Sequence, residues 1–295
     1  SMHCLPAMQV GKSASEQPCF TAAVIQLCSG REIDANIEAA SMLIREAATA
    51  GATYIQTPEV TNLIEMKSGP LFEKAEPPDD NRAVRAFAAL ASELGIWLHV
   101  GSMVVRLSDD KVANRAFVFD PHGRTAATYD KIHMFDVALP GGETYRESKR
   151  YQRGDKAVAV DLPWARLGVT ICYDLRFPAL YGDLVKAGCE IIAIPSAFTV
   201  PTGRAHWHVL LRARAIETQC FVIAAAQGGE HESGRKTFGH SLIVSPWGDV
   251  VAEVDTNAPG FALAEIDMAA VNQARERIPA HDHHVPFTTD TSYLT

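Results

Sequence analysis

Apolar runs of strand length alternate with amphipathic segments from residue 20 to residue 279. The segment from Ile33 to Ala50 repeats apolar residues at helical spacing and stops at Gly51, so it predicts an amphipathic helix. The almost continuously apolar run 20–27 predicts a buried strand instead. The same patterns predict strands over 53–59, 96–105, 114–119, 125–129, 165–172, 190–195, 220–226, 240–254 (a hairpin) and 260–267, and helices over 79–94, 178–188, 206–218 and 268–277.

This alternation of strands and helices, with hairpins interleaved, is typical of a layered α/β domain built on a mixed sheet. No Pro/Gly/Ser-rich linker divides the chain. We therefore expect a single domain over 20–279, a disordered or vector-derived tail over 1–19, and a C-terminal tail over 280–295 that is available to an oligomer interface.

Net charge, the length of apolar runs and the positions of the cysteines indicate which partners and which cellular compartment to expect. The net charge is −8, which gives no support to a nucleic-acid or anionic membrane surface, and no apolar run approaches the roughly 20 residues of a membrane-spanning helix. Cysteine stands at positions 4, 19, 28, 172, 189 and 220, with no CxxC pair and no spacing typical of zinc sites or disulfide frameworks. These features predict a reduced, cytoplasmic protein.

Three predicted strands end at a charged or reactive residue, namely Glu59, Lys131 and Cys172. Taken singly, each has a more ordinary interpretation, as a solvated carboxylate, a surface lysine and a buried free cysteine. Together they supply what acyl transfer needs: a nucleophile, a base that later acts as an acid, and a cation for the oxyanion. Ligands in α/β proteins tend to bind beyond the carboxyl ends of strands, where each of the three stands, but their spacing alone does not show that they meet.

The blocks around these residues, "TPEV", "YDKIHMFD" and "GVTICYDLRFP", resemble the three signature blocks of the nitrilase superfamily of carbon-nitrogen hydrolases. They occur in the family's order, and the resemblance runs from about Phe20 to Pro279. The stretches "FDVALPGGETYRESKRYQRGD", "LRARAIETQCFVIAAAQ" and "FGHSLIVSPWGDVVAE" are similar to the Nit branch, which contains the deaminated glutathione amidases and the ω-amidases. True nitrilases look more distant.

The resemblance implies a four-layer αββα sandwich that forms a homodimer or a higher homo-oligomer. It also implies a catalytic triad in which Glu59 is the base and acid, Lys131 stabilises the oxyanion and Cys172 is the nucleophile. Glu147 matches a supporting glutamate of the family, and the backbone N–H of Tyr173 is the natural second oxyanion donor. Neither a metal nor an organic cofactor is required by this chemistry.

The substrate-binding residues are predicted less directly. Arg176 suits a substrate carboxylate, because its guanidinium donates two parallel hydrogen bonds, but a structural salt bridge with Asp174 or another acid is the competing interpretation. Further candidates lie after the predicted strand 190–195: Phe198, Thr199, Thr202 and His206.

The expected reaction is hydrolysis of the terminal amide of a small carboxylate-bearing compound through a cysteine thioester, with release of ammonia. Deaminated glutathione is the first expected substrate. The alternatives are an ω-amidase acting on α-ketoglutaramate and another amidase of the superfamily, such as an N-carbamoyl hydrolase. A catalytically silent binding protein and a redox-sensing thiol protein are the rivals from other classes. The histidine cluster 281–284 offers metal ligands, but its non-periodic surroundings favour a solvated segment.

Overall fold

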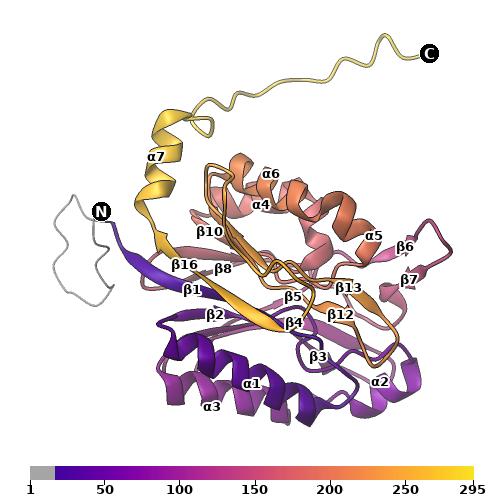
Figure 1. Ribbon diagram of the computed structural model, residues 1–295. Helices are drawn as coiled ribbons and strands as arrows, with labels where there is room; N and C mark the ends of the chain where they lie inside the picture. Colours follow the sequence, from indigo (N-terminus) through magenta and orange to yellow (C-terminus); the bar gives the residue numbers. More distant parts are fainter. Residues whose placement is uncertain (1–16) are drawn as a thin grey trace.

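Two six-stranded mixed sheets lie face to face at the centre of the molecule (Figure 1). The computed structural model describes residues 17–295. The first sheet contains, in spatial order, β16 (Gly260–Asp267), β1 (Cys19–Gln26), β2 (Tyr54–Gln56), β3 (Trp97–Arg106), β4 (Val112–Phe119) and β5 (Thr125–Asp130). The second contains β15 (Val250–Glu253), β14 (Leu242–Val244), β11 (Phe221–Ala224), β10 (Ile191–Ala193), β9 (Arg166–Val169) and β8 (Val158–Asp161).

Helices cover the outer face of each sheet (Figure 1). The first sheet is covered by α1 (Ile33–Thr49) and α3 (Arg82–Leu94), and the second by α4 (Pro178–Lys186) and α6 (His208–Thr218). Shorter helices are α2 (Ser68–Lys74), α5 (Val200–Thr202) and α7 (Ala269–Arg277). The resulting order of helix, sheet, sheet and helix confirms the predicted four-layer α/β sandwich.

The alternation of side chains along β1 explains why both faces of the first sheet are dry. Ala22 and Val24 belong to the core between the two sheets, whereas Ala23 and Ile25 belong to the core beneath α1 and α3. Because successive residues of a strand point to opposite faces, a strand buried on both sides is mostly apolar, as β1 is apart from Thr21 and Gln26.

Helix α3 shows how local sequence sets an element's ends. The side chain of Asn81 accepts a hydrogen bond from the Val84 N–H and caps the first turn, and Gly95 ends the helix in the left-handed region at φ 64°. The helix therefore begins three residues later than the predicted start at Asp79.

Most predicted elements are present, but several short ones were not predicted. These are α2, α5, β6 (Asp136–Ala138), β7 (Thr144–Arg146), β8, β12 (Gly228–Glu230) and β13 (Lys236–Phe238). All of them have few residues and mixed polarity, so no periodicity marks them. The predicted strand 165–172 is too long: β9 stops at Val169, and Cys172 begins a 3-10 turn that ends at Arg176.

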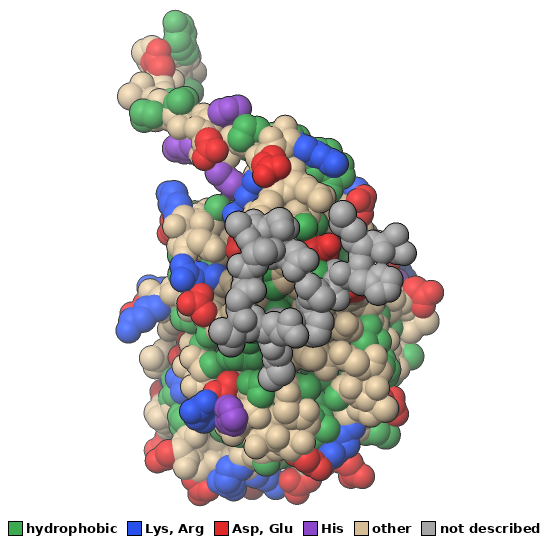
Figure 2. Space-filling view, turned by 90° about the vertical axis from the view of Figure 1, so that its left-hand side faces the viewer, with side chains coloured by type: hydrophobic (Ala, Val, Ile, Leu, Met, Phe, Trp, Pro, Cys, Tyr) green, Lys and Arg blue, Asp and Glu red, His purple; other side chains and the backbone are tan. Residues whose placement is uncertain are grey.

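The ordered domain begins one residue earlier than the predicted boundary at residue 20. The predicted N-terminal tail lies mostly outside the described residues, but Cys19 is a buried member of β1. Cys19 is also disulfide-bonded, so the expectation of a fully reduced set of cysteines is wrong for this residue. Beyond α7, the last residues stand clear of the body (Figure 2), with Phe287 84% and Tyr293 87% exposed.

Within residues 17–295, no helix combines the length and the apolar character that crossing a membrane would demand.

Candidate active site

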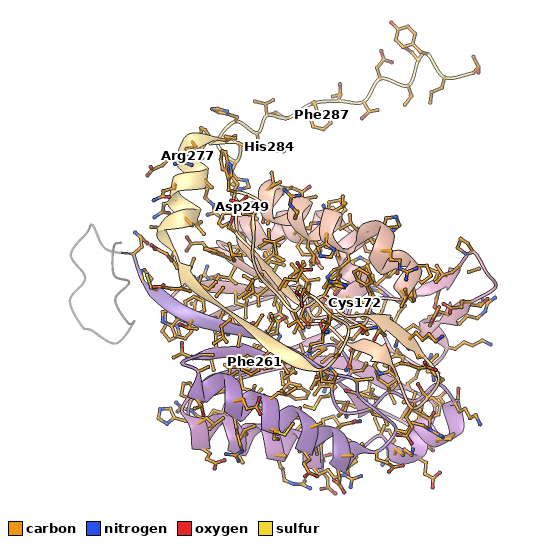
Figure 3. All side chains as sticks on the ribbon, viewed as in Figure 1. Cys172, Asp249, Phe261, Arg277, His284 and Phe287 are labelled. Atoms are coloured by element: carbon orange, nitrogen blue, oxygen red, sulfur yellow. The ribbon has the colours of Figure 1, made fainter. Side chains whose placement is uncertain are left out.

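A cavity of about 350 Å³ is lined by residues of both sheets and their loops, and Cys172, labelled in Figure 3, is a buried member of this lining. Most of the predicted site residues line it: Glu59, Lys131, Glu147, Cys172, Tyr173, Arg176, Phe198, Thr199 and Thr202. His206 does not line the cavity. It is an exposed residue whose Nδ1 lies 3.1 Å from Nη2 of Arg176.

Lys131 is the centre of a buried polar group. Its Nζ lies 2.9 Å from Oε2 of Glu59 and 2.9 Å from Oε1 of Glu147. Asn114 donates a hydrogen bond to Glu59 Oε2 over 2.9 Å, and the Phe135 N–H donates to Glu147 Oε1 over 3.1 Å. The Lys131 side chain is only 2% exposed, so the two carboxylates replace the water that a free ammonium would bind.

These contacts set the protonation of the group. Burial alone would raise the pKa of Glu59, but the charge and hydrogen bond of Lys131 outweigh it and the net pKa is lowered. Burial likewise opposes the charge of Lys131, yet Glu147 and Glu59 hold its pKa well above the usual value. The pKa of Glu147 is raised, chiefly by burial, with the charge of Glu59 adding to it. Glu59 is thus the more acidic carboxyl of the two and keeps its charge.

Cys172 is buried next to this group. Burial and the charge of Glu59 raise the pKa of its thiol, and Lys131 offsets only part of the effect. The neighbouring Ala197 N–H lowers the pKa of the thiol, and the side chain of Glu59 raises it. At neutral pH the resting residue is therefore a thiol, and it needs a base to become a nucleophile.

The backbone at the nucleophile is strained. Cys172 has φ 48° and Val60, which directly follows Glu59, has φ 51°. Non-glycine residues seldom adopt the left-handed region, and a β-branched residue such as Val60 does so least readily. Two such residues beside two reactive groups match the tendency of strain to collect at functional sites.

Asp174 holds the turn that carries Cys172. It is fully buried and accepts hydrogen bonds from Tyr129 Oη (2.5 Å), from the Ile171 N–H (3.0 Å) and from the His133 N–H (3.1 Å). The carboxylate oxygens of Asp174 thus already accept hydrogen bonds from neighbouring parts of the fold, and Arg176 does not form a salt bridge with them.

Arg176 faces the cavity instead. Its guanidinium lies 5.6 Å from the centre of the Phe198 ring, and it has no acidic partner within the part of the chain that the structure describes. The competing interpretation of Arg176, a structural salt bridge with Asp174, is wrong.

Sequence reasoning missed two residues of the site. Arg235 donates to the Ala197 carbonyl over 2.7 Å, lies 5.8 Å from the Tyr145 ring centre and lowers the pKa of Glu59 by its charge. It belongs to a turn with no recognisable motif, so no sequence signal marks it. Asn114 donates a hydrogen bond to Glu59 and is one of two polar residues, with Arg115, in an otherwise apolar strand, which is a signal that the sequence does offer.

The comparisons with known proteins agree with this geometry. The model of the family described as carbon-nitrogen hydrolase matches residues 21–276. The chain belongs to the carbon-nitrogen hydrolase family. This family assignment confirms the resemblance of the three signature blocks.

Known carbon-nitrogen hydrolases resemble this one over most of its length. It is 40% identical to the deaminated glutathione amidase of Bos taurus over 96% of its own chain and 86% of that protein. It is 38% identical to the deaminated glutathione amidase of Yersinia enterocolitica, over 89% and 92% of the two chains. The crystal structure of the C. elegans NitFhit protein superimposes with a TM-score of 0.85 at 34% identity, covering 94% of this chain and 69% of that one.

Proposed function

We propose that this carbon-nitrogen hydrolase is an amidase for small anionic amides, with deaminated glutathione as the leading substrate. The observation that carries the proposal is the charge of the cavity. Six basic and three acidic side chains line it, although the whole chain has a net charge of −8. A pocket of opposite sign to the rest of the molecule attracts and retains an anion. The names of the two relatives support the choice of substrate.

In the proposed mechanism Glu59 takes the thiol proton of Cys172 as the sulfur attacks the amide carbonyl. The Lys131 ammonium and the Tyr173 N–H stabilise the oxyanion of the tetrahedral intermediate. Glu59 then passes the proton to the nitrogen, the C–N bond breaks, and a thioester remains. Glu59 next deprotonates a water that attacks the thioester, the C–S bond breaks, and the sulfur recovers a proton. Glu147 keeps Lys131 in place throughout.

The leaving group depends on the amide. Ammonia leaves only from a primary amide such as α-ketoglutaramate. Deaminated glutathione contains only substituted amides, so its hydrolysis releases an amine, and an assay for ammonia alone would miss it.

Two guanidinium groups support a substrate with two carboxylates. Arg176 and Arg235 contact the neighbouring residues Phe198 and Ala197, and neither has an acidic partner among the described residues. Both arginines line the same cavity as Cys172, so both cations lie near the reacting atoms. Deaminated glutathione carries two carboxylates and α-ketoglutaramate carries one, so the pair of arginines favours the former.

The test is the measurement of kcat/KM for deaminated glutathione, α-ketoglutaramate, an N-carbamoyl amino acid and a plain nitrile, with detection of both amine and ammonia. We expect the highest value for deaminated glutathione and no turnover by Cys172→Ala. Turnover restricted to N-carbamoyl compounds would point to the other amidases. Absence of turnover of every amide would favour the binding or redox-sensing alternatives.

We also propose that the protein is cytoplasmic and forms a homodimer or higher homo-oligomer. The proposal of a reducing compartment rests on four free thiols, Cys28, Cys172, Cys189 and Cys220, and the disulfide at Cys19 stands against it. Support for self-association comes from apolar side chains exposed on α6 and on the hairpin β14–β15: Val209, Ile216, Trp247, Val250 and Val251. We call these five residues the α6–hairpin patch.

A further inference from the structure

We propose that His208, His240 and Glu253 form a binding site for a divalent transition metal ion such as Zn²⁺. His208 Nε2 lies 2.6 Å from Glu253 Oε1, and His240 Nδ1 lies 3.1 Å from the same oxygen. The three ligand atoms all lie within 4.8 Å of one another. In residues 17–295 this is the one group of three or more His, Cys, Asp or Glu side chains that converge in this way. We call it the His–Glu–His cluster.

The chemistry of the cluster fits the ion. Two imidazoles and a carboxylate are a common ligand set for Zn²⁺, with bonds of about 2.0–2.2 Å, and a fourth position remains for water. Ligand atoms around a tetrahedral ion with such bonds are roughly 3.3 Å apart. Glu253 Oε1 lies 2.6 Å from His208 Nε2 and 3.1 Å from His240 Nδ1, and the two imidazole nitrogens lie within 4.8 Å of each other, so side-chain movements of about an ångström would admit the ion. The side chains are 37%, 27% and 27% exposed, which leaves a path for the ion to enter.

The cluster is held by its surroundings rather than formed by mobile surface groups. His240 lies in the left-handed region at φ 57°, and its carbonyl accepts a hydrogen bond from Trp207 Nε1 over 2.9 Å. The ring of Phe238 stacks on His240 at 4.5 Å. His208 is fixed as the first residue of α6, where α6 follows the π-helical turn Gly203–Trp207. Ligands held in place in advance lose little conformational entropy when they bind.

The site is separate from the catalytic cavity, since none of its three residues lines that cavity. It is connected to the cavity wall, however, because the Phe238 N–H donates to the Phe198 carbonyl over 2.9 Å. The ion would thus join α6, β15 and the end of β13, and it would stabilise the folded protein without taking part in the reaction.

The histidines of the C-terminal tail are the main competing ligands. His281 contacts the Thr218 carbonyl over 3.0 Å, and the tail histidines do not converge with other ligands in the described structure. The metal reading of residues 281–284 therefore has no structural support, but the experiment must separate the two sites.

The test is Zn²⁺ binding to the metal-free full chain, measured by competition with a chromogenic chelator and by the shift in Tm. We expect one tightly bound ion per chain and a higher Tm on binding. Single variants His240→Ala, His208→Gln and Glu253→Gln should each weaken binding by about 10-fold or more and abolish the Tm shift. His122→Ala, on an exposed turn, and the triple variant His281→Ala/His283→Ala/His284→Ala should bind as the parent does.

Circular dichroism of each metal-free variant shows whether it has folded. Because there are three separate ligand variants, the test still works if one of them does not fold. Binding that disappears in the tail variant or in Cys172→Ala, while the cluster variants retain it, would overturn the proposal. So would the absence of stoichiometric binding by the parent chain. The test does not depend on the substrate, so the proposed amidase activity and the metal site can fail separately.

Discussion

Lys131 and its two carboxylates form a group that is almost completely shielded from water, and the protonation of Cys172 depends on it. Burial and the charge of Glu59 raise the pKa of the thiol and favour its protonated form at rest. In the proposed mechanism the proton therefore leaves as the sulfur attacks the carbonyl, and Glu59 is the carboxylate proposed to take it.

We therefore predict that Glu59→Gln lowers kcat by a factor of roughly 10² to 10⁴, the usual contribution of a general base. The amide keeps the shape of the side chain and removes only its basicity. Glu65→Gln is the matched control, because Glu65 also lines the cavity but pairs with Arg31 at 3.1 Å. Steady-state kinetics of both variants test the prediction, and an equal loss in the two would contradict a specific role for Glu59.

The pH dependence follows from the same residue. Since the pKa of Glu59 is lowered, the base stays ionised at neutral and mildly acidic pH, and kcat/KM should fall only as the pH drops below the ordinary range of a carboxyl group. Arg235 contributes to this lowering, so Arg235→Met should move the acidic limb to higher pH. The measurement is the pH profile of kcat/KM for the parent chain, for Arg235→Met and for the surface control Arg124→Met. An acidic limb at the same pH in Arg235→Met and in the parent would contradict the electrostatic role of Arg235.

At the scale of elements, β3 brings the segments that carry Glu59 and Cys172 together. A Cβ atom at Gly101 would lie 2.1 Å from the Thr57 carbonyl oxygen and 2.4 Å from Pro195 Cβ. Thr57 lies two residues before Glu59, and the Pro195 carbonyl accepts the N–H of Cys172 over 2.9 Å. Only glycine allows the strand to approach both segments so closely.

Gly101→Ala should consequently lower both Tm and kcat/KM, with a loss in the free energy of unfolding of about 1–3 kcal/mol or more from overpacking. Gly69→Ala is the control, because an added Cβ there meets nothing within 4 Å. Thermal unfolding and kinetics of the two variants provide the measurement. Parent-like values for Gly101→Ala would show that the backbone shifts at little cost.

The elements differ in how far sequence predicts them. Long periodic segments such as Ile33–Thr49 and apolar strands such as β1 are visible because burial imposes a repeat on their residues. The hairpins β6–β7 and β12–β13 carry no such repeat, and they hold Tyr145 and Arg235 near the cavity. The three family signature blocks are sufficient to predict Glu59, Lys131 and Cys172 as site residues. The long-range contacts of Asn114 and Arg235 arise only from the tertiary structure.

At the scale of the whole molecule, the α6–hairpin patch is continuous. An added Cβ at Gly248 of the hairpin would lie 2.7 Å from Ile216 of α6, and Arg212 of α6 donates to the Gly248 carbonyl over 2.8 Å. Apolar side chains that gather on one exposed face, rather than being scattered singly, are typical of surfaces that associate.

We predict that Val209→Asp/Ile216→Asp reduces the molar mass of the protein in solution to that of a single chain, because the new charges would have to be buried in the contact. Met42→Asp, on α1 at the opposite face, should leave the mass unchanged; Met42 is 57% exposed. Light scattering coupled to size-exclusion chromatography distinguishes the two. A mass that is the same for the double variant and the parent would place the contact elsewhere.

The burial and the raised pKa of Cys172 also affect how its thiol reacts with electrophiles other than the substrate. A small alkylating reagent reacts with thiolates, and the raised pKa of the Cys172 thiol disfavours the ionised sulfur even though the residue lines the open cavity. Cys28 is more exposed to such reagents, because it is only partly buried. If the proposed roles of Glu59 and the two arginines hold, an inhibitor of this enzyme needs two properties at once: an anionic group for Arg176 and Arg235, and a carbonyl-like electrophile that the sulfur attacks once Glu59 has taken its proton. The selectivity of such an inhibitor for this enzyme would then depend on proton transfer from Cys172 to Glu59 within the cavity, and the general reactivity of the inhibitor toward thiols would contribute little.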